Sequence, residues 1–223
     1  MIKTVLFDFV NTLAYLNPRR EDILKKYIEI KECSRWDQKD IIGAFLHTDE
    51  EYPYSSVKIL TEEDRRAHFK HYNKKLFKQL NIPESGDFYD YYTTVPKKWE
   101  LDDEALPVLK NLKERGCDVG VISNFDRGLE SVLAELGIAP LIDFLVVSQQ
   151  IGLEKPDIEF YKYVQMRYNI DVENTLYVGD SLSLDYLPAR QVGIESYLLD
   201  KNDFYGNEAE RVKSLLEILD HVT

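Results

Sequence analysis

The chain has 223 residues, of which 44% are hydrophobic and 30% are charged, a composition typical of a globular protein. It carries 28 basic and 40 acidic residues, and the net charge of −12 argues against nucleic acid as the main partner because phosphate backbones bind basic surfaces. The two cysteines, Cys33 and Cys117, lack the spacing of a zinc site or a disulfide framework, which favours a reducing compartment. No signal peptide is visible and no apolar run is long enough to cross a bilayer, so we expect a cytoplasmic protein without a membrane partner.

Short apolar runs alternate with helical patterns along most of the chain. The runs are rich in Val, Ile, Leu and Phe, which is typical of strands buried on both faces of a parallel sheet. They lie near residues 3–10, 118–122, 141–147, 175–179 and 194–199. Helical periodicity covers residues 106–115, 127–136, 157–168, 183–191 and 207–219, with Asp126 as a possible N-cap of the second helix. This alternation predicts an α/β fold with a parallel sheet.

Residues 15–98 interrupt the alternation. They contain helical segments but no convincing buried strand, and they are nearly charge-balanced, so the net negative charge lies in the rest of the chain. We therefore predict a separate helical module inserted after the first strand. Its linkers are expected around residues 14–18 and 96–99.

One helix of this module is expected over residues 62–80. Four apolar side chains recur at helical spacing and should pack inward, and four basic ones form a stripe on the opposite face. The inward set is Phe69, Tyr72, Leu76 and Leu80, and the stripe is Arg66, Lys70, Lys74 and Lys78. We interpret the stripe as a solvated helix face in preference to a surface that recruits anions.

Polar residues follow several of the predicted strands. Asp8 ends the first run, Ser123 follows the second, Asp180 follows residues 175–179, and Lys155 comes shortly after residues 141–147. Ligands of open parallel sheets bind at the carboxyl ends of the strands, so we expect these four side chains to gather at one edge. An acid, a hydroxyl, an amine and a second acid at one edge are typical of a reaction centre.

These segments resemble the haloacid dehalogenase superfamily of hydrolases, in the subgroup whose helical cap follows the first strand. The motifs that carry the resemblance are FDFVNTL at residues 7–13, VISN at 121–124, Lys155-Pro156-Asp157, and Gly179-Asp180 with Asp185. Four motifs in the right order form a strong signal although each alone is weak. The resemblance implies a Rossmann-like core formed by residues 1–14 and 99–223, and a mobile α-helical cap formed by residues 15–98.

The resemblance also implies a reaction and a metal. Asp8 would be the nucleophile that attacks phosphorus and forms an aspartyl phosphate on the way to hydrolysis of a small phosphate ester. Mg²⁺ prefers oxygen ligands, and the Asp8 carboxylate, the backbone carbonyl of Val10 and the Asp180 carboxylate could supply them.

The remaining motif residues would support this chemistry. Lys155 places a positive charge against Asp8 and the phosphoryl oxygens, and the Ser123 hydroxyl adds a hydrogen bond. Thr12, which supports the loop, and Asn124 are expected with them on the substrate side. Asp185 should act from the outer shell, holding either a metal-bound water or Lys155.

Val10 departs from the pattern. Related phosphatases carry an Asp at this position, which protonates the leaving alcohol and then activates water; valine does neither. Loss of acid–base catalysis typically costs about 10²–10⁴-fold, so we expect slow turnover. Asn11 stands in place of the usual glycine, which asparagine tolerates in a left-handed turn.

Two other functions remain open at this stage. A halide leaves without a proton, so Val10 also suits a 2-haloacid dehalogenase that uses Asp8 without a metal. Asp180 argues against that alternative because two neighbouring carboxylates repel unless a cation lies between them. The second alternative is a regulatory or binding protein that retains the fold and turns over little. The sequence carries no signal for oligomeric state or for the identity of the substrate.

Overall fold

The computed structural model describes residues 1–31, 36–52, 61–83 and 86–222, so Cys33 lies outside the described residues. The chain divides into two compact units, Met1–Tyr15 with Trp99–Thr223, and Leu16–Lys98. No helix in the described ranges is both long and apolar enough to cross a membrane.

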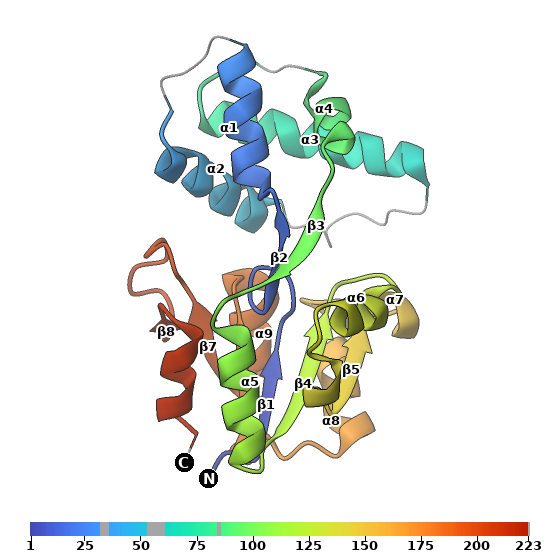
Figure 1. The fold of residues 1–223 in the computed structure, drawn as a ribbon, viewed down its shortest axis with the longest axis vertical. Helices are drawn as coiled ribbons and strands as arrows, with labels where there is room; N and C mark the ends of the chain where they lie inside the picture. Colours follow the sequence, from blue (N-terminus) through green and yellow to red (C-terminus); the bar gives the residue numbers. More distant parts are fainter. Residues whose placement is uncertain (32–35, 53–60, 84–85, 223) are drawn as a thin grey trace. The chain divides into compact units, whose positions relative to one another are not determined.

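The first unit is built on a six-stranded sheet in the order β5-β4-β1-β6-β7-β8 (Figure 1). Every neighbouring pair is parallel, with β1 at the centre between β4 and β6. The strands are β1 (Thr4–Phe7), β4 (Asp118–Ser123), β5 (Phe144–Val147), β6 (Thr175–Gly179), β7 (Glu195–Leu199) and β8 (Arg211–Val212). The predicted α/β fold with a Rossmann-like parallel sheet is confirmed.

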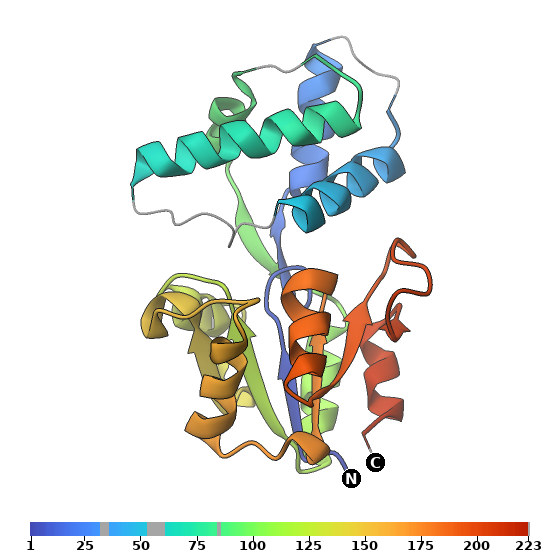
Figure 2. The same ribbon diagram turned by 180° about the vertical axis from the view of Figure 1, so that it is seen from behind.

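Helices cover both faces of this sheet, as Figures 1 and 2 show from opposite sides. One face packs against α5 (Ala105–Glu114), α6 (Leu129–Glu135) and the 3₁₀ helix η5 (Leu215–Asp220), the other against α8 (Ile158–Tyr168) and α9 (Leu187–Gln191). Successive side chains of a strand point to opposite faces. Val5 and Phe7 therefore join the first cluster and Leu6 the second. The short helices are η2 (Ala139–Leu141), α7 (Ser148–Ile151), η3 (Val172–Asn174) and η4 (Leu182–Tyr186).

The predicted helix over residues 207–219 is wrong. Arg211 and Val212 form β8 on the edge of the sheet, and a 3₁₀ helix follows. Arg211 is held there by ion pairs with Asp200 at 2.8 Å and Asp203 at 2.7 Å. Apolar residues spaced by three or four positions suit a 3₁₀ turn packed on α5 as well as an α-helix, so periodicity alone could not separate the two.

The predicted N-cap at Asp126 is also wrong. α6 begins two residues later than expected, at Leu129, and its N-cap is Gly128. The Asp126 carboxylate instead accepts a hydrogen bond from the Gly128 N–H at 2.7 Å, which closes a tight turn before the helix.

The described residues of the second unit form four helices, labelled in Figure 1. They are α1 (Arg20–Ile30), α2 (Gln38–Glu51), α3 (Glu62–Gln79) and α4 (Phe88–Thr94). Capping boxes start two of them, Asp37 with Asp40 on α2 and Thr61 with Asp64 on α3. The two segments that connect the units pair with each other as a two-stranded sheet, β2 (Ala14–Asn17) with β3 (Lys98–Leu101), a pairing that the sequence did not indicate.

The predicted helix over residues 62–80 is confirmed by α3. Tyr72, Leu76 and Leu80 are buried and Phe69 is half-buried, as the spacing indicated. The four basic residues of the stripe are exposed, as expected of a solvated face.

Candidate active site

The strand β1 delivers Asp8 to the carboxyl edge of the sheet. The Asp8 N–H donates to the Val178 carbonyl of β6 at 2.8 Å, which fixes the residue immediately after the strand, and its side chain is only 8% exposed. The loop that follows turns at Asn11, which has a φ of 60° and donates its N–H to the Ala14 carbonyl at 2.7 Å. Asn11 thus takes the left-handed conformation that asparagine tolerates.

Lys155 binds three side chains of this edge at once. Its Nζ lies 2.7 Å from Asp8 Oδ1, 2.6 Å from Asp185 Oδ1 and 3.2 Å from the Tyr177 hydroxyl. The side chain is 2% exposed. An ammonium group has three N–H donors, so these three bonds use them all. Lys155 thereby links Asp8, which follows β1, to Asp185 of the Gly179-Asp180 motif.

Asp185 is held from several sides. The Tyr177 hydroxyl donates to its Oδ1 at 2.5 Å and the Ser181 N–H donates to its Oδ2 at 3.1 Å. A Cβ on Gly179 would lie 2.4 Å from Asp185 Cγ, so only glycine permits this approach. Asp185 lies in η4, a π-helical turn of the kind often found at functional sites.

Tyr177 is a site residue that the sequence analysis missed. It lies in the middle of the buried strand β6 and was counted with the apolar run. The available signal was a hydroxyl-bearing side chain in a fully buried strand, two residues before Gly179-Asp180, because a buried Tyr hydroxyl needs a hydrogen-bond partner.

Ser123 and Asn124 of the VISN motif form two different kinds of contact at the same edge. The Ser123 hydroxyl donates to Asp8 Oδ1 at 3.3 Å. The Asn124 carboxamide binds the backbone of Lys155, donating to its carbonyl and accepting from its N–H, both at 2.8 Å. Thr12 is fully buried, and its hydroxyl forms no hydrogen bond with the part of the chain that the structure describes.

Burial and neighbouring charges shift the pKa values of Asp8 and Lys155. Burial raises the pKa of Asp8 to about 6, and the attraction of Lys155, partly offset by repulsion from Asp185, moderates that rise. Burial disfavours the charged form of Lys155, yet the attraction of Asp185 and Asp8 outweighs it and raises the lysine pKa above its usual 10.5. Lys155 is therefore an ammonium group at any physiological pH.

Three carboxylates of the edge form a group with the composition of a metal site. Ligand oxygens of Asp8, Asp180 and Asp185 all lie within 4.8 Å of one another. An all-oxygen, carboxylate set fits hard ions such as Mg²⁺ and does not suit zinc or copper, which favour nitrogen and sulfur. Asp185 thus belongs to this group as well as holding Lys155. A ligand role for the Val10 carbonyl stays a prediction.

The Val10 side chain is half-buried and packs against the apolar cluster of the sheet. Its backbone bridges to Ala14 across the loop. The position therefore offers no acid or base to a substrate at Asp8.

The geometry of this edge can be compared with known proteins. A family model of haloacid dehalogenase-like hydrolases matches residues 2–193. The chain belongs to this family. The resemblance seen in the four motifs is confirmed, and the protein is a hydrolase.

Among curated relatives of this hydrolase, the glyceraldehyde 3-phosphate phosphatase of Methanocaldococcus jannaschii is 28% identical over 236 residues, covering 100% of this chain and 97% of the relative. The haloacid dehalogenase-like hydrolase domain-containing protein 3 of Danio rerio is 34% identical over 108 residues. That match covers 48% of this chain and 45% of the relative, so it spans about half of each protein.

Solved structures share the fold of this hydrolase. The HAD-hydrolase YfnB from Bacillus subtilis, bound to magnesium, superposes with a TM-score of 0.66 at 20% identity, covering 100% of this chain and 99% of that one. A dehalogenase with an intermediate complex has a TM-score of 0.67 at 14% identity, covering 99% and 97%. At these identities the likeness carries the fold and no specific activity.

Proposed function

We propose that the protein is a Mg²⁺-dependent phosphatase that hydrolyses a small phosphorylated metabolite through an aspartyl phosphate on Asp8. The observation that carries the proposal is the position of Asp180. Ligand oxygens of Asp8, Asp180 and Asp185 lie within 4.8 Å of one another, and Lys155 forms ion pairs with two of these residues, Asp8 and Asp185. Carboxylates this close to one another repel unless positive charge lies between them, and an all-oxygen group of this kind suits a divalent metal.

The residues of the edge have distinct parts in this reaction. An Asp8 oxygen attacks phosphorus, forming the acyl phosphate bond as the bond to the leaving oxygen breaks, and water then cleaves the acyl phosphate and regenerates the carboxylate. Lys155 and the Ser123 hydroxyl already contact Asp8 and supply positive charge and a donor to the phosphoryl oxygens. Mg²⁺ held by Asp8, Asp180 and the Val10 carbonyl would neutralise the remaining charge on those oxygens.

A full-length relative supports the proposed substrate class. The M. jannaschii relative, matched along its whole length, is a phosphatase of a three-carbon phosphate ester. We infer a small phosphate ester here too, with residues 15–98 as a cap domain that contributes to its recognition. A cytoplasmic setting, without nucleic acid or membrane partners, fits such a substrate.

Val10 makes slow turnover part of the proposal. The leaving alkoxide must take its proton from solvent, and the water that cleaves the acyl phosphate has no carboxylate to activate it. The expected loss is about 10²–10⁴-fold relative to a site that has both functions. Esters with stable leaving anions should be hydrolysed fastest.

A screen of phosphorylated metabolites, aryl phosphates and acyl phosphates, each with Mg²⁺ and with EDTA, tests the metal assignment. Activity should vanish in EDTA, return with Mg²⁺ and be lost in Asp180→Asn. The matched control is Asp118→Asn, the same change at an exposed residue where β4 begins, which should behave as wild type.

Dehalogenation is the second candidate, favoured by the apolar Val10, because a halide leaves without a proton. Short 2-haloacids in the same screen separate the two reactions. Metal-independent halide release that survives Asp180→Asn would replace the phosphatase by a dehalogenase. Tight Mg²⁺ binding without turnover of any compound would instead indicate a binding protein.

A further inference from the structure

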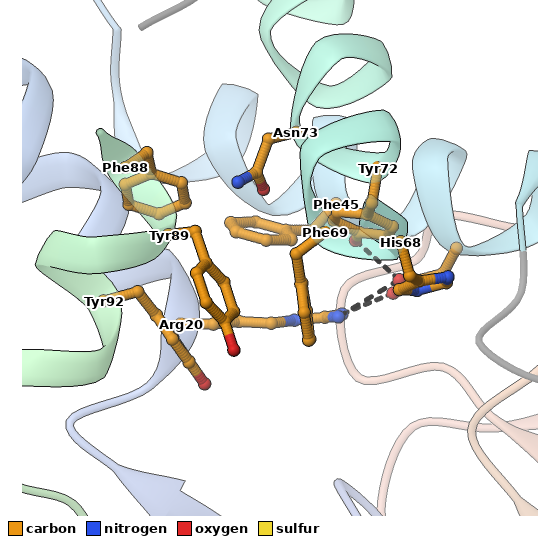
Figure 3. A pocket seen from close by; sticks show the side chains of 10 residues that line it. Arg20, Phe45, His68, Phe69, Tyr72, Asn73, Phe88, Tyr89 and Tyr92 are labelled. Carbon is orange, nitrogen blue, oxygen red and sulfur yellow. Dashed lines mark hydrogen bonds and ion pairs between the residues drawn. The ribbon is translucent and has the colours of Figure 1, made fainter. Parts of the chain in front are cut away.

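The helical unit of residues 16–98 contains a cavity of about 220 Å³, and its lining includes none of the residues assigned to the chemistry at Asp8. Side chains of all four helices line it (Figure 3). Six of them are Phe or Tyr, namely Phe45, Phe69, Tyr72, Phe88, Tyr89 and Tyr92, and the His68 ring stacks on Tyr72. Apolar cavities lined by aromatic rings and a few polar groups are the usual form of small-molecule sites.

Asn73 is a polar residue of this lining whose side chain faces the cavity. It is 7% exposed, and its carboxamide points from α3 toward the cavity (Figure 3). The carboxamide forms no hydrogen bond with any residue that the structure describes. Its nitrogen and oxygen are not among the fully buried atoms that lack a partner, so they open onto the cavity, where a molecule in the cavity can bond them. A ligand that hydrogen-bonds Asn73 would supply the missing partner.

The charged residues of the lining neutralise each other. Arg20 donates to Asp49 through both terminal nitrogens, with one N–O distance of 3.1 Å, and its Nε donates to Glu21 at 3.0 Å. Tyr72 donates to the same Asp49 carboxylate at 2.7 Å. The guanidinium also lies 4.6 Å from the centre of the Phe45 ring. Both charges are thus engaged within the protein, which favours an uncharged ligand.

The volume limits the size of that ligand. An engineered apolar cavity of about 150 Å³ accepts benzene, so a cavity of about 220 Å³ accepts one or two fused rings. Planar rings suit a site walled by aromatic side chains, where stacked and edge-on contacts add to the burial of apolar area.

We propose that residues 16–98 bind an uncharged planar aromatic molecule of one or two rings whose single polar group hydrogen-bonds Asn73. Binding at this site needs neither metal nor phosphate. It is therefore measured in EDTA, where its outcome is independent of the proposed phosphatase activity.

Indole and indene are the probes. They have nearly the same shape, but only indole has a ring N–H that can donate to the Asn73 carbonyl oxygen. Calorimetric titration of the full chain should give a Kd for indole about tenfold lower than for indene, the usual effect of one buried hydrogen bond. In Asn73→Leu, which keeps the volume and loses the carboxamide, the two probes should bind equally.

Asn73→Phe should fill the cavity and abolish binding of both probes. Gln79→Leu is the matched control, since it exchanges a carboxamide for leucine at an exposed position of the same helix and should bind as wild type. Circular dichroism and the Tm establish that each variant is folded.

A wild-type measurement covers the case in which an Asn73 variant does not fold. Indole should shift the Asn73 side-chain amide resonances in an NMR titration, and indene should shift the surrounding aromatic resonances. The proposal is overturned if neither probe binds at millimolar concentration, if both bind wild type equally, or if the Asn73 amide does not move while indole binds.

Discussion

Asn124 and Lys155 exchange two hydrogen bonds, the carboxamide of Asn124 donating to the Lys155 carbonyl and accepting from its N–H, both at 2.8 Å. This pair fastens the main chain of Lys155 to the residue that follows β4. The Lys155 ammonium reaches Asp8 from that anchored backbone. Asn124 thus positions the cation although it does not touch it.

We expect Asn124→Ala to lower kcat by about tenfold, because Lys155 loses its fixed backbone and small displacements at a reacting centre are costly. Steady-state kinetics with Mg²⁺ on the best substrate of the screen measure the effect. Asn202→Ala, the same change at an exposed turn, is the control and should leave kcat unchanged. An Asn124→Ala enzyme with wild-type kcat would remove the positioning role.

Tyr177→Phe removes one hydroxyl and keeps the buried ring. Asp185 and Lys155 each lose a partner, at 2.5 and 3.2 Å, so the carboxylate should become less well oriented. We expect kcat to fall roughly 3–10-fold, the effect of about one hydrogen bond. Tyr168→Phe, whose hydroxyl contacts the Leu145 carbonyl away from the site, should change kcat by less than twofold. Equal kinetics of the two variants would show that the Tyr177 hydroxyl is dispensable.

Gly179→Ala tests the close packing of the fourth motif. The added Cβ would lie 2.4 Å from Asp185 Cγ, so η4 must move and its hydrogen bonds to Lys155 and Ser181 must lengthen. We expect a lower Tm and loss of most activity. Gly43→Ala is the matched control, because nothing lies within 4 Å of its added Cβ in α2 and the change should stabilise by about 0.5–1 kcal/mol. A Gly179→Ala protein as stable and active as wild type would show that η4 can move to accommodate the added Cβ at little cost in free energy.

The sequence predicted the parts of this protein that follow from local pattern. Buried parallel strands are continuous apolar runs, so β1, β4, β5, β6 and β7 were visible, and the residues at their carboxyl ends had to meet at one edge. Asp8, Ser123, Lys155 and Asp185 do lie in contact there.

What the sequence did not predict depends on contacts between distant segments. The role of Tyr177 arises from where η4 folds back, and the anchoring by Asn124 depends on how two loops meet. The strand β8 is set by the edge of the sheet and not by its own two residues. The cavity around Asn73 exists only when four helices pack, so no single helical pattern could reveal it.

The raised pKa of Asp8 predicts how the metal-free protein responds to pH. The pKa of an ordinary Asp carboxyl is 3.8 and that of Asp8 in the folded state is about 6, so between these values the folded state holds more protons than the unfolded one. The contribution of Asp8 to stability is therefore greatest below pH 4, falls as the pH rises toward 6 and is constant above. Two units correspond to at most about 3 kcal/mol.

The Asp8→Asn variant has a carboxamide in place of the carboxyl group, so its stability lacks this dependence on pH. In EDTA its Tm should exceed that of wild type at pH 7.5, and the difference should shrink as the pH is lowered through 6 to 4. Excess Mg²⁺ should reverse the order at pH 7.5, since only wild type gains the full metal affinity. Thermal unfolding by circular dichroism across this pH range measures the difference. A Tm difference that does not vary with pH would show that Asp8 has an ordinary pKa.

Val10→Asp should restore the missing acid–base group. The Val10 side chain is half-buried against the core, so the new carboxylate loses some hydration and its alignment is imperfect. For alkyl phosphates, whose leaving alkoxide needs a proton, we expect a gain of about 10–100-fold, less than the full acid–base factor. For p-nitrophenyl phosphate, whose leaving group departs as a stable anion, formation of the acyl phosphate should hardly change, while its hydrolysis should speed up because the carboxylate can activate water. Rapid-quench kinetics separate the two steps.

Val10→Asn is the control, since it matches the shape of Asp but cannot transfer a proton, and it should remain as slow as wild type. The prediction is contradicted if the Val10→Asp enzyme is folded and binds Mg²⁺ but hydrolyses every alkyl phosphate tested no faster than Val10→Asn does. Proton transfer at position 10 would then not limit the rate.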